Sequence, residues 1–164
     1  MRQSRSGEPD LPSSQALVTL QLLTLLAPKL SDDFSGLGIV FYDSLAVLPF
    51  LPLDVTGSEN FDLPVSGLGA ISDVLARTAR RSSHWHDGFH FVQASSVCLT
   101  HLCQYIAPPL PDTGDTLPRA SGARHMTALL ASRVNGVVMV GLLTQERVVS
   151  IYESGALTLN EVLP

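Results

Sequence analysis

The sequence predicts one α/β domain with a central mixed β-sheet flanked by helices. Its 164 residues fit a single domain, which buries roughly 70% of the surface that the unfolded chain exposes. Hydrophobic residues make up 45% of the chain and charged residues only 15%, a composition that favours a thick core. Segments with helical periodicity also alternate with short apolar runs typical of buried strands, which is the pattern of layered α/β folds.

Three segments have the spacing of amphipathic helices. The first begins at Ser13 or Ser14, both N-cap candidates, and extends to about Leu30. Its apolar stretch is well short of the roughly 20 residues that cross a bilayer, so we expect a core helix and no membrane span. The second covers 67–79 and ends in arginines, which suit a helix C-terminus. The third covers about 122–134.

The strand candidates are short, apolar and rich in β-branched residues. They are 36–42, 88–93, 97–106, 136–143 and 148–152. Residues 46–53 contain two prolines, so we expect an edge strand or a loop there. Residues 107–117 read as a loop, and a turn at Ser154-Gly155 precedes a final short strand. Residues 1–12 are polar and are expected to form a disordered lead to the domain at 13–164.

Charge and cysteine content exclude some classes of function. Ten Lys and Arg against fifteen Asp and Glu give a net charge of -5, which is unlike a protein that binds duplex nucleic acid. The two cysteines, Cys98 and Cys103, lack a CxxC spacing. We therefore expect reduced, packed thiols in a cytoplasmic protein.

The first candidate site is the run SSHWHDGFHFV at 82–92. Asp87-Gly88 stands at the entrance of an apolar strand, where a carboxylate would lie at the mouth of the sheet and a glycine would let a ligand approach the backbone. This arrangement suits a metal or a ribose. The alternative is a simple Asp-Gly turn before a strand.

The second candidate site is the run ASGARHMTALL at 120–130. Arg124 and His125 fall in the first turn of the predicted helix, where an exposed cation costs about 0.3–1 kcal/mol against the helix dipole. An anion in front of the helix would reverse this cost, so the exposed N–H groups, Gly122 and the two cations suit a phosphate. The alternative is a solvated arginine and a surface histidine.

A third candidate is the histidine set His84, His86 and His90. In an extended segment these even positions would share one face, as a zinc site requires. The set has neither a cysteine partner nor the spacing of two histidines on one helix turn, which argues against zinc.

The first two runs, in this order and at this spacing, resemble the signature motifs DGA and GTRHR of diadenylate cyclase (DAC) domains. The likeness extends from about residue 36 to the C-terminus. Residues 83–89 (SHWHDGF) are similar to the family's approach to His-Asp-Gly-Ala, and 122–128 (GARHMTA) resemble GTRHRAA. Residues 143–146 (LTQE) lie in the region of the family's Ser-Glu-Glu.

This resemblance implies a role for each matching position. DAC domains condense two ATP molecules into cyclic di-AMP, and a symmetric pair of domains is needed for turnover. Asp87 would hold a magnesium or manganese ion that activates a ribose hydroxyl. The other matching positions would bind the nucleotide; they are Gly88, Phe89, Gly122, Ala123, Arg124, His125 and Thr144.

Three departures from the family pattern bear on activity. Phe89 replaces the alanine after Asp-Gly, Ala123 replaces a threonine, and Met126 replaces the second arginine. A lost charge-assisted hydrogen bond costs about 1.5–3 kcal/mol, enough to cripple turnover. Phe89 either stacks on a base or fills the site.

The sequence therefore favours a divergent DAC-like sensor or regulatory module that binds ATP or cyclic di-AMP with weak or no cyclase activity. Two alternatives remain open. One is an active metal-dependent cyclase that works as a homodimer. The other is a structural or self-association domain with a vestigial pocket.

Overall fold

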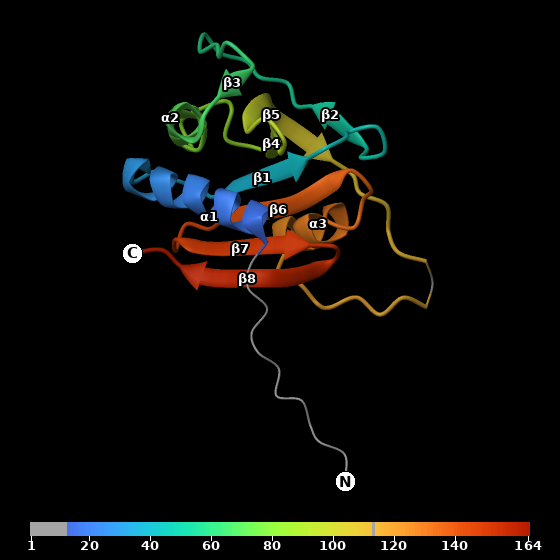
Figure 1. The fold of residues 1–164 in the computed structure, drawn as a ribbon. Coiled ribbons are helices and arrows are strands. Elements are labelled where there is room, and N and C mark those ends of the chain that lie inside the picture. The colour runs from blue at the N-terminus through green and yellow to red at the C-terminus, as the bar shows by residue number, and fades with distance from the viewer. Residues whose placement is uncertain (1–12, 113) are drawn as a thin grey trace.

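The computed structural model describes residues 13–112 and 114–164, which form three α-helices and one mixed sheet of eight strands (Figure 1). The predicted α/β fold class is confirmed. The expected N-terminal lead, 1–12, lies outside the described residues.

The sheet has the order β2-β5-β4-β1-β6-β7-β8, with β3 also pairing with β5. Strands β1 and β4 run parallel, and every other described pair is antiparallel. The strands are β1 (Leu37–Tyr42), β2 (Phe50–Pro52), β3 (Val65–Ser66), β4 (Phe89–Gln93), β5 (Cys98–Ile106), β6 (Val137–Leu143), β7 (Val148–Glu153) and β8 (Ala156–Val162).

Helices cover both faces of the sheet, which explains why all six residues of β1 are buried. Successive strand residues point to opposite faces. Ile39 accordingly packs in a core cluster with α1 (Ser14–Leu26) and α2 (Leu68–Thr78), whereas Val40 packs in a second cluster with α3 (Ala123–Ala131). Figure 1 shows α1 in front of the strands, α3 behind them and α2 to the left of β4 and β5.

The predicted helices and strands are present in the structure, which adds the two-residue strand β3, and the differences at their ends have local causes. The Ser13 hydroxyl accepts a hydrogen bond from the Ala16 N–H at 3.0 Å, which confirms it as the cap of α1. Helix α1 ends at Leu26, before a 3₁₀ turn at Ala27–Lys29 that contains Pro28.

At the two edges of the sheet the strands differ in length. The proline-containing segment 46–53 contributes only the three-residue edge strand β2. The final strand, β8, has seven residues and is as long as β6.

Two further expectations concern α1 and the cysteines. Among the described residues, no helix combines the length and the apolar character that crossing a bilayer requires. Cys98 and Cys103 are both free thiols, and Cys103 is buried.

Candidate functional site

The topology brings both sequence motifs to one end of the sheet. Strands β1 and β4 are parallel, and Ile39 of β1 pairs with His90 of β4. Gly36 and Asp87 each precede this pair by three residues, so they lie at the same end of the two strands. Strand β6 runs the other way, and its last residue, Leu143, pairs with the first residue of β1. The start of β1, the start of β4 and the end of β6 therefore meet at one edge.

Asp87 lies at this edge with an exposed side chain. Its Oδ1 is 3.6 Å from Nε2 of His86, and its side chain is 69% exposed. The His86 Nδ1 is 2.6 Å from the Ser83 carbonyl oxygen, which holds the ring beside the carboxylate. Asp87 is thus accessible to a ligand or a cation.

Gly88 is required by the packing of the neighbouring strand. Its φ is +75°, and a Cβ atom there would lie 2.6 Å from the Gln104 carbonyl oxygen. The glycine therefore allows β5 to approach β4 closely, whether or not a ligand is present.

Phe89 is a core residue. It is only 6% exposed and packs in the α3-side cluster with Phe91 and Leu129. A Cβ atom at Gly38 would lie 2.6 Å from the Phe89 ring, so the ring covers the place where β1 has no side chain. The Phe89 ring therefore fills the space that a small residue at this position would leave open.

Helix α3 presents its first turn to the same edge. Gly122 caps the helix with φ +89° and no side-chain hydrogen bond, followed by Ala123, Arg124 and His125. Arg124 Nη1 lies 2.8 Å from where a Cβ of Gly36 would be, so its guanidinium sits against the backbone leading into β1. Among the described residues, the Arg124 side chain has no hydrogen-bond partner and no ion pair.

His125 is held by a tyrosine of the sheet. Its Nδ1 is 2.7 Å from the Tyr152 hydroxyl, and the two rings meet edge to face with centroids 6.0 Å apart. Burial raises the pKa of the Tyr152 hydroxyl, which therefore stays protonated near neutral pH. The imidazole orientation is set by the protein.

A pocket of about 270 Å³ joins three of the predicted residues. Arg124, His125 and Thr144 all line it. Asp87 is not among the lining residues. The other six lining residues were not predicted as site residues from the sequence. They are Ser35, Gly36, Leu142, Leu143, Gln145 and Glu146.

Glu146 is the acid of this pocket. Hydrogen bonds from its own backbone N–H and from the Thr144 hydroxyl lower the pKa of its carboxyl group. The likeness of Thr144-Gln145-Glu146 to the Ser-Glu-Glu of DAC domains could have identified Glu146 as a site residue. Nothing in the local sequence around Ser35 marks it as a site residue.

The three histidines of the zinc alternative are separated. His84 is exposed beside Gly57, whereas His90 is fully buried. Residues 81–88 form turns and bends, so these side chains do not follow the alternation of a strand. Across the part of the chain that the structure describes, no three His, Cys, Asp or Glu residues come together as a metal site.

His90 has a structural role at an irregularity of the sheet. The β4–β5 register shifts beside it, and Cys103 has a positive φ of 58°. The freed N–H of Cys103 donates to His90 Nδ1 at 3.1 Å, so the other ring nitrogen, Nε2, carries the proton. Nε2 is buried and has no partner among the described residues. Burial, and next the Arg124 charge, lower the pKa of His90 to about 3.

Solved structures show which known fold this is. The chain resembles a hypothetical membrane-spanning protein from Bacillus cereus, with a TM-score of 0.54, 16% identity, and coverage of 92% of this chain and 65% of that one. It also resembles a double mutant of DacA from Staphylococcus aureus, a diadenylate cyclase, with a TM-score of 0.51, 17% identity, and coverage of 90% and 86%. The chain has the DacA fold. No protein-family model and no curated protein matches its sequence.

The fold implied by the two sequence motifs is therefore confirmed. At 16–17% identity the likeness concerns the fold. The ligand and the activity must be argued from the side chains at the edge of the sheet.

Proposed function

We propose that this domain binds an adenine nucleotide, ATP or cyclic di-AMP, and acts as a sensor or regulatory module with weak or no cyclase activity. The observation that carries the proposal is Arg124. Its partly buried guanidinium lines a pocket without a protein partner among the described residues. A desolvated cation without a partner is costly, and a phosphate would supply both the charge and the acceptors.

The surroundings of Arg124 favour a phosphate further. It lies in the first turn of α3, whose N–H groups and dipole attract anions. His125 is already oriented by Tyr152, so one ring nitrogen remains for a ligand. The likeness to DacA supports adenine among the bases.

Two residues favour binding over turnover. Phe89 fills the space beside Gly38, and Met126 stands where a second phosphate arginine would be expected from the resemblance. The loss of one charge-assisted hydrogen bond costs about 1.5–3 kcal/mol, or roughly ten- to a hundredfold in rate.

The residues present fit a magnesium or manganese ion only together with a nucleotide. Asp87 supplies a hard, exposed oxygen donor, and Mg²⁺ is commonly held by one or two carboxylates plus substrate phosphates. Such an ion would offset the repulsion between Asp87 and the phosphates and would polarise a phosphoryl oxygen.

Replacing Arg124 with alanine is expected to weaken nucleotide affinity by about 1.5–3 kcal/mol, since one charge-assisted contact is lost. The stability of the domain should stay level or rise slightly, because a cation leaves the positive end of α3. Titration calorimetry with ATP and cyclic di-AMP, with urea unfolding in parallel, measures both quantities.

Arg133→Ala is the matched control. Arg133 lies just beyond the other end of α3 and pairs with Asp115 at 2.9 Å, so this variant removes the same charge away from the pocket. It should leave nucleotide affinity nearly unchanged. Equal affinities in wild type and Arg124→Ala would reject the phosphate site and favour a vestigial pocket.

Asp87→Asn separates a sensor from a cyclase. The variant should lose any metal dependence of ATP binding and any cyclic di-AMP production, whereas metal-free binding of cyclic di-AMP should persist, because the carboxylate repels phosphate when no cation is present. Product analysis after incubation with ATP and manganese checks the turnover. Abundant cyclic di-AMP from the wild-type protein would establish the active cyclase instead.

A further inference from the structure

A second guanidinium group, that of the exposed residue Arg81, contacts a residue that lines the same pocket. Arg81, three residues after the end of α2, donates from Nη2 to the Gln145 side-chain oxygen at 3.4 Å. Gln145 lines the pocket together with Arg124. Arg124 therefore lines the pocket from α3, and Arg81 lies beside it, in contact with the lining residue Gln145.

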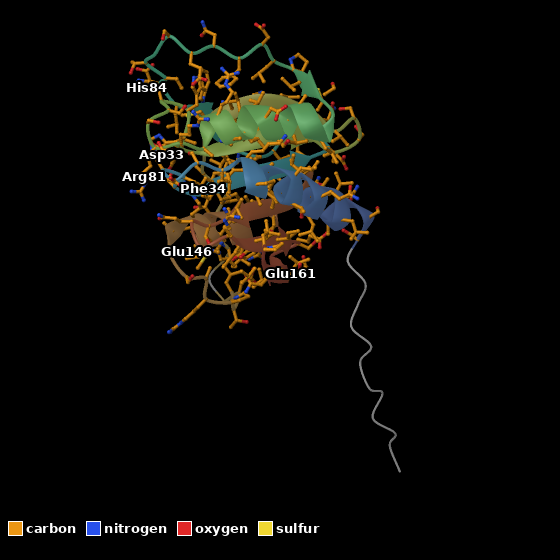
Figure 2. The ribbon with its side chains drawn as sticks, turned by 90° about the vertical axis from the view of Figure 1, so that its left-hand side faces the viewer. Asp33, Phe34, Arg81, His84, Glu146 and Glu161 are labelled. Atoms are coloured by element: carbon orange, nitrogen blue, oxygen red, sulfur yellow. The ribbon has the colours of Figure 1, made fainter. Side chains whose placement is uncertain are left out.

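The backbone that carries Arg81 is held in place by Asp33. The Arg81 N–H donates to the Asp33 carbonyl oxygen at 3.1 Å, and the Ser82 hydroxyl donates to the Asp33 carboxylate at 2.8 Å. A β-bridge between Phe34 and Arg80 joins the same two segments. Hydrogen bonds from the Ser31 and Ser82 hydroxyls lower the pKa of Asp33, which keeps it ionised. Figure 2 shows Asp33, Arg81 and Glu146 along one side of the molecule.

The pocket also contains an unsatisfied hydroxyl group. Ser35 lines it, and the Ser35 Oγ is buried without a hydrogen-bond partner among the described residues. Buried polar groups are rarely left unpaired unless a ligand or water completes them. This observation is independent of the two arginines, and a water molecule or a ligand oxygen is the kind of group that would complete the hydroxyl.

We propose that Arg81 and Arg124 together bind consecutive phosphates of a nucleoside triphosphate, with Arg81 supplying the second cation that Met126 does not. The inference rests on the proposed function and narrows its ligand to a nucleotide with a polyphosphate chain. A guanidinium group presents several donors in a rigid plane that matches phosphate oxygens. Two guanidinium groups on separate elements suit a ligand with several linked phosphates better than a ligand with one phosphate.

The test compares ATP, ADP and AMP by titration calorimetry in the presence of magnesium. Arg81→Ala should weaken ATP binding about tenfold, the effect of one charge-assisted hydrogen bond, while AMP affinity stays nearly unchanged. Arg81→Lys should fall between wild type and alanine for ATP, since lysine keeps the charge but loses the planar donors.

Arg80→Ala is the control for a general effect of charge. Arg80 is exposed, and its replacement removes the same charge from the neighbouring position in the chain. If Arg80→Ala weakens ATP as much as Arg81→Ala, or if Arg81→Ala weakens AMP and ATP equally, the inference is overturned. If Arg124→Ala weakens ATP but Arg81→Ala does not, the proposed function stands and only the role of Arg81 fails. If no nucleotide binds the wild-type protein, both fail.

Discussion

Replacing Phe89 with alanine is expected to lower the free energy of unfolding by about 3–5 kcal/mol and at the same time to tighten nucleotide binding. The stability falls because the ring is almost fully buried and packs in the α3-side core cluster. Binding improves because the cavity would open beside Gly38, at the edge where the pocket lies, with the small residue that DAC domains carry there. Urea unfolding and titration calorimetry measure the two effects on the same protein.

Phe91→Ala is the matched control for this prediction. Phe91 belongs to the same strand and the same core cluster and is fully buried, but it lies two residues further from the edge. It should destabilise the domain to a similar degree without improving nucleotide affinity. Phe89→Leu keeps more of the packing and serves if the alanine variant does not fold. Unchanged affinity in a folded Phe89 variant would show that this ring does not occupy ligand space.

Lowering the pH from 7.5 to 5.0 is expected to reduce the free energy of unfolding by about 2 kcal/mol through His90 alone. The pKa of this ring is about 3 in the folded protein and 6.5 in its ordinary state. Between pH 6.5 and 3, His90 is therefore protonated in the unfolded chain but neutral in the folded protein. Its contribution to the free energy of unfolding is complete above pH 6.5 and decreases as the pH falls toward 3. The loss is about 1.4 kcal/mol for each pH unit below 6.5.

His90→Asn tests this assignment. The asparagine amide oxygen can take the place of Nδ1 as acceptor for the Cys103 N–H, and it does not titrate. Urea unfolding at both pH values should then show a smaller pH dependence than in the wild-type protein. His101 contributes in the same direction, since burial lowers its pKa as well, and His101→Asn measures that share. An equal pH dependence in wild type and His90→Asn would contradict the assignment.

Part of the candidate site could be predicted from local sequence. Arg124 and His125 were predicted as site residues from the motif at 120–130 and Thr144 from the likeness at 143–146, and all three line one pocket. Each sits at the end of a helix or strand whose periodicity was clear. Ser35 and Arg81 could not be predicted, because they belong to segments without a motif. Ser35 lines the pocket, and Arg81 contacts the lining residue Gln145, only because β1 lies between β4 and β6 in the sheet.

The role of individual side chains within a motif depended on packing. The sequence left open whether Phe89 stacks on a base or fills the site, and the contact with Gly38 places it in the core. The sequence suggested that Gly88 lets a ligand approach the backbone, whereas the atoms nearest to a Cβ at this position belong to Gln104 of β5. His90 was grouped with two histidines by spacing, whereas a shift of register between β4 and β5 turned it toward Cys103.

Except for the two-residue strand β3, the sequence by itself therefore determined the order and type of the elements and the α/β class, because periods of 3.6 and 2 residues record which side of a segment is buried. Only the tertiary structure decided the strand order and the composition of the pocket. These depend on which distant segments pair: the parallel pairing of β1 with β4 and the antiparallel pairing of β1 with β6 bring Gly36, Asp87 and Thr144 to one edge. No local pattern encodes that choice, because an apolar strand is compatible with many partners.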